Sequence, residues 1–219
     1  MSAADPLLEL LVRGPVLPVV PVETPAVGLA LADALASGGL TTLEITLHTD
    51  AALDAIRAIR DARPDLAVGA GTVRDPSQLD ACARAGAAFA ASPGATARLL
   101  DAAAGHDVPL LPGAATPGEV MALLERGHRA VKIFPIEALG GIAFLNALAI
   151  PLPDARFCPS GGVSAASAPD YLALASVLCV NGSWLAPPEA VAAGDWGRVT
   201  DRARAAAALS PRSHGGEPG

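Results

Sequence analysis

One residue in this sequence has the chemistry of an amine nucleophile. Of the 15 basic residues of the 219-residue chain, Lys132 is the single lysine and the rest are arginines. In the apolar run at 130–135, side chains alternate so that Lys132 and Phe134 share one face. A lysine in dry surroundings has its neutral form favoured, as attack on a carbonyl carbon requires. The pattern predicts imine chemistry at Lys132, and the competing interpretation is a surface lysine retained by chance.

A carboxylate is expected to lie opposite this amine. In the run at 42–48, apolar side chains alternate with Glu44, Thr46 and His48. The apolar face suits packing against helices, so Glu44 is expected to point inward, where a carboxylate is costly unless it is paired or used. Glu44 and Lys132 would then converge, and Glu44 would move the protons that imine formation requires. A buried ion pair without chemistry is the competing interpretation.

Two glycine-containing loops indicate a phosphate site. The seventh predicted strand, at 155–160, runs into Ser160, Gly161 and Gly162, and the eighth, at 176–183, runs into Asn181, Gly182 and Ser183. Loops at these places in a barrel frequently hold phosphate through backbone N–H groups and a helix N-terminus. The alternative is that the glycines simply make tight turns. A metal site is not predicted, because the histidines at positions 48, 106, 128 and 214 and the three cysteines lack ligand spacing.

Strands and helices alternate along the chain. Short apolar runs typical of buried parallel strands lie at 16–22, 42–48, 66–73, 88–94, 108–114, 130–135, 155–160 and 176–183. Helices are expected near 25–37, 50–62, 76–85, 95–104, 117–126, 141–149, 165–173 and 187–208. Eight such units predict an α/β fold, a (β/α)8 TIM barrel whose single domain spans 1–209, with a disordered C-terminal tail at 210–219. A doubly wound sheet would require a glycine-rich turn after the first strand. Residues 16–26 contain no glycine, so this fold is not favoured.

The composition narrows the class of protein. Hydrophobic residues make up 52% and charged residues 17%, which excludes a disordered chain. The net charge of −7 argues against a nucleic-acid partner. No run approaches the roughly 18 apolar residues of a membrane span, and no basic segment precedes the first apolar stretch as in a signal peptide. Three cysteines, an odd number, indicate a reducing compartment. A cytoplasmic globular protein is expected.

Several strings at the strand ends resemble those of one enzyme family. LEITLHT, GAGTV, SPG, LPGAATPGE, KIFPIEALGG, RFCPSGGV and NGSWL occur in this order. Together, over about residues 15–190, they resemble the 2-keto-3-deoxy-6-phosphogluconate (KDPG) aldolase family, which includes 2-keto-4-hydroxyglutarate (KHG) aldolases. The resemblance implies a cytoplasmic class I aldolase with the TIM-barrel fold and a small-molecule 2-keto acid substrate, phosphorylated in the KDPG case. It also implies a homotrimer that needs no metal or organic cofactor.

The resemblance assigns roles position by position. It makes Lys132 the Schiff-base lysine and Glu44 the general acid and base. Thr72 matches a residue that hydrogen-bonds the pyruvate half of the substrate, and Pro93 and Phe134 match the pocket wall.

The phosphate end of the family's site is matched in the two glycine-containing loops. Ser160 stands where the family usually has threonine, so the hydroxyl is kept. Gly161, Gly162 and Ser183 match the positions around the phosphate.

Two departures from the family pattern concern the substrate. His48 stands where the family usually has an arginine that grips the substrate carboxylate, and histidine is charged only part of the time near pH 7. Asn181 stands where the family usually has glycine, so its side chain would either crowd a phosphate or bond to another group. A non-phosphorylated substrate such as 4-hydroxy-2-oxoglutarate, a catalytically inactive anion-binding barrel and a metal-dependent class II aldolase are the open alternatives.

Overall fold

The computed structural model describes residues 5–209, so the predicted tail at 210–219 lies outside the described residues. The strands are β1 (Val16–Val20), β2 (Thr42–Thr46), β3 (Ala67–Gly71), β4 (Ala90–Ala91), β5 (Leu110–Leu111), β6 (Gly113–Ala114), β7 (Ala130–Ile133), β8 (Arg156–Pro159) and β9 (Val180–Gly182). The helices are α1 (Pro6–Leu11), α2 (Pro25–Ser37), α3 (Ala52–Ala62), α4 (Pro76–Ala85), α5 (Ala97–Ala103), α6 (Pro117–Glu125), η1 (Glu137–Leu139), α7 (Gly141–Ala149), α8 (Ala168–Leu172), α9 (Pro188–Ala193) and α10 (Trp196–Ala207). No helix within this part of the chain is both long enough and apolar enough to cross a membrane.

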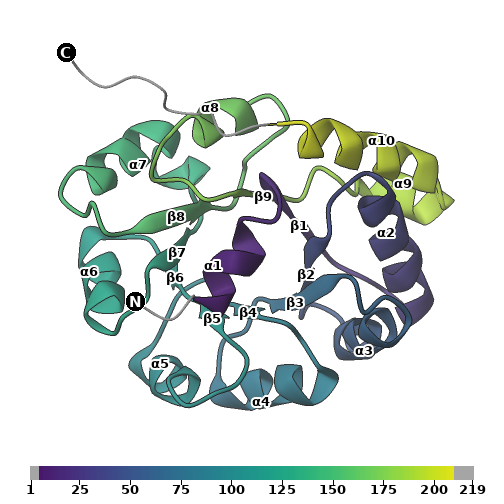
Figure 1. Cartoon of the computed structure of the whole chain (residues 1–219), viewed down its shortest axis with the longest axis horizontal. Coiled ribbons are helices and arrows are strands. Elements are labelled where there is room, and N and C mark those ends of the chain that lie inside the picture. Colours follow the sequence, from purple (N-terminus) through teal and green to yellow (C-terminus); the bar gives the residue numbers. More distant parts are fainter. Residues whose placement is uncertain (1–4, 210–219) are drawn as a thin grey trace.

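All strand pairs are parallel, and the strands curl around a common centre with the larger helices outside them (Figure 1). Six strands pair in the order β5-β4-β3-β2-β1-β9, and a second sheet has the order β6-β7-β8. The predicted α/β fold with a parallel sheet is confirmed, but the predicted single closed barrel is not shown, because the strands form two sheets.

The two sheets separate for local reasons. The strand predicted at 108–114 is divided into β5 and β6 by Pro112, which has no N–H to continue a ladder. On the other side, β8 and the segment leading into β9 meet through a single isolated bridge between Phe157 and Val177. Both gaps lie on the side of the curled sheet that carries β6, β7 and β8.

Proline and capping side chains start several helices where the sequence predicts. Asp75 and Thr116 accept hydrogen bonds from the backbone N–H groups of Gln78 and Glu119, and a proline follows each cap. The prediction of a single helix at 187–208 was wrong. The segment forms two helices, α9 and α10, because Gly194 adopts the left-handed region at φ 65°.

Helix α1 was not predicted, and it closes one end of the fold. It lies across the centre of the curled strands (Figure 1). Leu7 and Leu11 are buried in an inner cluster with Leu17, Phe89, Ala91, Leu111, Ala130, Cys158 and Cys179. The Thr42 hydroxyl at the start of β2 donates a hydrogen bond of 3.3 Å to the Leu10 carbonyl. Helix α1 therefore covers the end at which the strands begin, opposite to the end at which parallel-strand folds place their sites.

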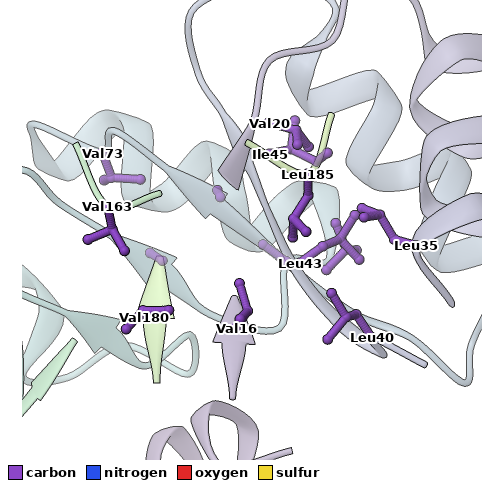
Figure 2. Packing of buried hydrophobic residues seen from close by; sticks show 14 of the residues in the cluster. Val16, Val20, Leu35, Leu40, Leu43, Ile45, Val73, Val163, Val180 and Leu185 are labelled. Carbon is purple, nitrogen blue, oxygen red and sulfur yellow. The ribbon is translucent and has the colours of Figure 1, made fainter. Parts of the chain in front are cut away.

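The larger core lies between the strands and the surrounding helices. Figure 2 shows Leu35 of α2 beside Leu40 and Leu43, with Val16 and Val180 on neighbouring strands. Side chains of alternating strand residues separate into this outer core and the inner cluster, as Val131 and Ala130 do. Side chains that form a site at the open end of the strands therefore lie on the inner face, on the side of the inner cluster away from α1.

The packing of α2 against α10 leaves no room for a side chain at position 38. A Cβ on Gly38 would lie 2.4 Å from the Ala203 Cβ and 2.7 Å from the Thr200 carbonyl oxygen. We expect Gly38→Ala to lower the free energy of unfolding by about 1–3 kcal/mol, as overpacking does. Denaturant unfolding measures this, with Gly118→Ala as the control, because a Cβ there meets nothing within 4 Å. Equal stability of the two variants would contradict the close contact of α2 with α10.

Candidate active site

A buried ion pair occupies the inner face of the curled strands. The Lys132 amine on β7 donates to Glu44 Oε1 at 2.9 Å and to Oε2 at 3.2 Å across from β2. The two side chains are only 6% and 1% exposed, respectively. The predicted inward orientation and convergence of Glu44 and Lys132 are therefore confirmed.

Glycines of the string GAGTV make room for this pair and for the layer beneath it. A Cβ on Gly71 would lie 2.1 Å from Glu44 Oε1, so a larger residue would displace the carboxylate. A Cβ on Gly69 would lie 2.3 Å from the Phe89 ring. The sequence alone does not indicate this role, because a small residue in a strand does not reveal what it accommodates.

Asn181 is a third polar residue in contact with the pair. It lies on β9, is 4% exposed, and its side-chain amide donates to Glu44 Oε2 at 3.2 Å. Of the two alternatives that the sequence left open, the structure shows the second: the Asn181 side chain bonds to the carboxylate. Its Oδ1 atom is buried and has no hydrogen-bond partner among residues 5–209.

Two cysteines lie under these polar groups. Cys158 on β8 and Cys179, just before β9, are fully buried with their sulfur atoms 3.8 Å apart. The hydrogen bond with Cys158, followed by burial, holds the pKa of the Cys179 thiol well above its ordinary value. Cys179 is therefore a neutral thiol near neutral pH. The ion pair in this part of the site consists of Lys132 and Glu44.

His48 and Thr72 form a second polar group. The His48 Nε2 atom lies 3.3 Å from the Thr72 hydroxyl, and its Nδ1 atom lies 3.3 Å from the Thr46 hydroxyl. Thr72 adopts a positive φ of 61°, which is rare for a β-branched residue and is concentrated at functional sites. His48 is exposed and Thr72 half-buried, so this group lies nearer the solvent than Lys132.

The loop after β8 requires its two glycines. Gly161 and Gly162 have φ values of 91° and 95°, in the left-handed region. A Cβ on Gly162 would lie 2.5 Å from the Glu137 Cγ, and a Cβ on Gly161 would lie 3.0 Å from the Phe134 ring. The Glu137 N–H donates to the Gly161 carbonyl at 3.2 Å, which ties this loop to the segment after β7.

The other predicted residues lie after the ends of the strands but do not contact the ion pair through hydrogen bonds. Pro93 after β4 is half-buried, Ser160 after β8 is buried, and Ser183 after β9 is exposed. Phe134 is 37% exposed, which is unusual for a large apolar side chain in this fold. Within residues 5–209, no grouping of three or more metal-ligating side chains is present.

The arrangement suits covalent chemistry on a carbonyl compound. A buried amine can add to a ketone once it is neutral, and the adjacent carboxylate can take and return the protons. Residues at the carboxyl ends of parallel strands form the sites of enzymes with this kind of architecture. The fold and the pair together define the class of lysine-dependent aldolases.

Comparisons with known proteins show the family. The family model described as KDPG and KHG aldolase matches residues 8–202. A KHG/KDPG aldolase of Escherichia coli is 49% identical over 198 residues, covering 90% of this chain and 93% of that protein. A 2-dehydro-3-deoxy-phosphogluconate aldolase of Pseudomonas aeruginosa is 49% identical over 191 residues, 87% of each chain. The chain belongs to the KDPG and KHG aldolase family.

Solved structures of relatives agree with this assignment. A KDPG aldolase of Legionella pneumophila, with pyruvate captured as a covalent carbinolamine intermediate, has a TM-score of 0.91 and 38% identity, covering 94% of this chain and 99% of that one. The aldolase of Zymomonas mobilis with 3-phosphoglycerate has a TM-score of 0.88 and 40% identity, covering 94% and 96%.

Proposed function

We propose that this protein is a class I aldolase that cleaves 2-keto-3-deoxy-6-phosphogluconate to pyruvate and glyceraldehyde 3-phosphate. The observation that carries the proposal is the buried pair of Lys132 and Glu44, with the amine 2.9 Å from the carboxylate. Relatives at 49% identity that carry this activity in their names support the substrate.

In the proposed mechanism, the Lys132 amine adds to the C2 ketone of the substrate. Glu44 removes and returns protons through a water molecule, so that the carbinolamine loses water and becomes a protonated imine. Glu44, through the same water, then takes the proton of the C4 hydroxyl; the bond between C3 and C4 breaks, and its electron pair moves to the imine. The aldehyde leaves, and protonation and hydrolysis of the enamine release pyruvate and the free amine.

The other predicted residues bind the substrate in this proposal. Thr72 and His48 hold the pyruvate half, since their side chains already lie within 3.3 Å of each other. Pro93 and Phe134 form the pocket wall, and the exposed part of Phe134 becomes covered by substrate.

The distal end of the substrate meets the loops after β8 and β9. Ser160, Gly161, Gly162 and Ser183 hold the phosphate there. The left-handed backbone of the two glycines supports this role, because such turns present backbone N–H groups to anions.

A second substrate, 2-keto-4-hydroxyglutarate, is favoured by the double name of the Escherichia coli relative. Its cleavage uses the same amine and the same carboxylate and differs only in the group that meets the loops after β8 and β9. Turnover of both keto acids, measured side by side, shows which one this chain prefers.

The test of the proposed function is reductive trapping combined with turnover. Borohydride added together with pyruvate should leave a stable adduct on Lys132, located by peptide mass spectrometry. Pyruvate release from KDPG should be detected by coupling to lactate dehydrogenase. Absence of the adduct, or labelling of the N-terminus alone, would rule out the lysine mechanism, and sensitivity to EDTA would favour a metal-dependent aldolase. Tight phosphate binding without cleavage would favour an inactive anion-binding protein.

His48→Arg should lower the KM for pyruvate. An arginine is always charged and binds a carboxylate through two parallel hydrogen bonds, whereas histidine offers one at a time. The expected gain of about 1–2 kcal/mol corresponds to roughly a 5- to 30-fold lower KM. The control is His48→Gln, which keeps a donor without charge and should not lower the KM. An unchanged KM in the arginine variant would mean that His48 does not face the substrate carboxylate.

We further propose that the two sheets belong to one eight-stranded barrel, with β5 and β6 as one interrupted strand, in a single domain over 1–209. The Lys132 N–H donates to the Pro112 carbonyl at 2.9 Å and the Leu178 N–H to the Phe157 carbonyl at 3.0 Å, which supports closure on both sides. A cytoplasmic homotrimer is the assembly that the family resemblance implies. Light scattering on the purified protein measures the number of subunits.

A further inference from the structure

Asn181 is buried inside the candidate site with half of its amide unpaired. Its nitrogen contacts Glu44 Oε2 at 3.2 Å, while Oδ1 meets no donor within residues 5–209. An ionised carboxylate only accepts hydrogen bonds, so the amide must turn its NH2 group toward Glu44. This requirement leaves Oδ1 as the free atom and excludes a flipped amide.

A buried acceptor without a donor is unusual in a folded protein. Leaving such a group unsatisfied destabilises the folded state, and more than nine in ten buried polar groups find a partner. Asn181 is bonded on one side to a carboxylate that Lys132 also contacts, so Oδ1 lies close to the reacting groups. The nearby Cys179 thiol already bonds to Cys158 and does not supply the missing donor. An O–H group that enters the site, as water or as part of the substrate, can supply the missing donor.

The hydrogen bond between Asn181 and Glu44 matters most after Lys132 has reacted with the substrate. In the free enzyme, Lys132 contacts both oxygens of the carboxylate. Once the lysine nitrogen bonds to a substrate carbon, it has fewer N–H groups to donate. A buried carboxylate that loses its partner is strongly destabilised and tends to move. The Asn181 amide takes no part in the covalent change, so its NH2 group remains available to hold Oε2.

We propose that Asn181 is a positioning residue, which holds the Glu44 carboxylate while Lys132 carries the substrate and accepts an O–H hydrogen bond at Oδ1. The inference rests on the proposed lysine aldolase function. The O–H donor is either the water that shuttles protons to and from Glu44 or the C4 hydroxyl of the keto acid.

The experiment compares Asn181→Ala with Asn146→Ala, since Asn146 is an exposed asparagine on α7 and is not part of the candidate site. Cleavage of KDPG gives kcat and KM, and exchange of the pyruvate methyl protons in D2O, followed by NMR, reports imine formation and proton transfer without any C4 hydroxyl. Asn181→Asp is the second variant, because it is isosteric but removes the donor to Glu44. Denaturant unfolding checks that each variant is folded.

We expect Asn181→Ala to lower kcat about tenfold or more, with a smaller change in KM, as loss of a hydrogen bond to a charged group does. Asn181→Asp should lose more, because a second carboxylate would face Glu44. If pyruvate exchange slows together with cleavage, the O–H donor is the water; if only cleavage slows, it is the C4 hydroxyl.

Two results would overturn the proposal. One is wild-type kcat in Asn181→Ala. The other is wild-type kcat in Asn181→Asp, which is the result expected if the side chain at position 181 only fills space. Borohydride trapping separates this inference from the function on which it rests. If the wild-type protein forms no pyruvate adduct, the lysine mechanism fails. If the wild type and Asn181→Ala both form the adduct, an unchanged kcat in Asn181→Ala contradicts the role of Asn181 and leaves the lysine mechanism intact.

Discussion

Lys132→Met should abolish aldol cleavage, with kcat falling at least ~10⁴-fold to the background, because the covalent route is lost together with its nucleophile. Methionine has a similar length and no amine, so the space that the lysine side chain occupies stays filled. Pyruvate release from KDPG measures the loss, and borohydride trapping should give no adduct on the variant. Residual turnover within an order of magnitude of the wild type would contradict the assignment of Lys132.

The same substitution should also weaken the fold. Glu44 is 1% exposed at its side chain, and removal of one partner of a buried ion pair costs about 3–5 kcal/mol. The double variant Lys132→Met with Glu44→Gln should recover most of this stability, since no uncompensated charge remains. The matched control is Arg204→Met, which breaks an exposed ion pair with Asp201 and should change the unfolding midpoint little.

Glu44→Gln should lower kcat by about 10²–10⁴-fold, the usual contribution of a positioned general acid and base. Glutamine keeps the volume that Gly71 accommodates, so the expected effect is chemical. Steady-state kinetics with KDPG measures the loss, and the pyruvate adduct on Lys132 should still form, but more slowly. Glu125→Gln, an exposed carboxylate on α6, is the control. Unchanged kcat in Glu44→Gln would mean that the carboxylate only stabilises the fold.

These two predictions separate the functions of the ion pair. Loss of the amine removes the covalent intermediate altogether, whereas loss of the carboxylate leaves the intermediate and slows the proton transfers around it. A lysine and a glutamate that only stabilised the fold would change the unfolding free energy in both variants without this difference in trapping. The combination of kinetics, trapping and unfolding therefore tests function and stability independently.

Local pattern was sufficient for much of the fold and for the orientation of the central pair. The two-residue alternation of strands placed Glu44 and Lys132 on the inner face, because successive side chains in a strand point to opposite sides. The helix predicted at 76–85 begins where Asp75 caps it, since capping involves neighbours within a few residues. The strings at the strand ends are by themselves sufficient to indicate the family.

Contacts between distant segments required the folded chain. The bond from Asn181 to Glu44 spans 137 residues, and the space that Gly71 leaves for the same carboxylate is formed between two strands. Helix α1 was likewise missed, because burial of Leu7 and Leu11 depends on strands that follow later in the chain. The break at Gly194 is different, because it depends on the local left-handed conformation of this glycine. Sequence periodicity reports the face of an element on which a side chain lies, whereas the partner that it meets there depends on how all the strands curl around one centre.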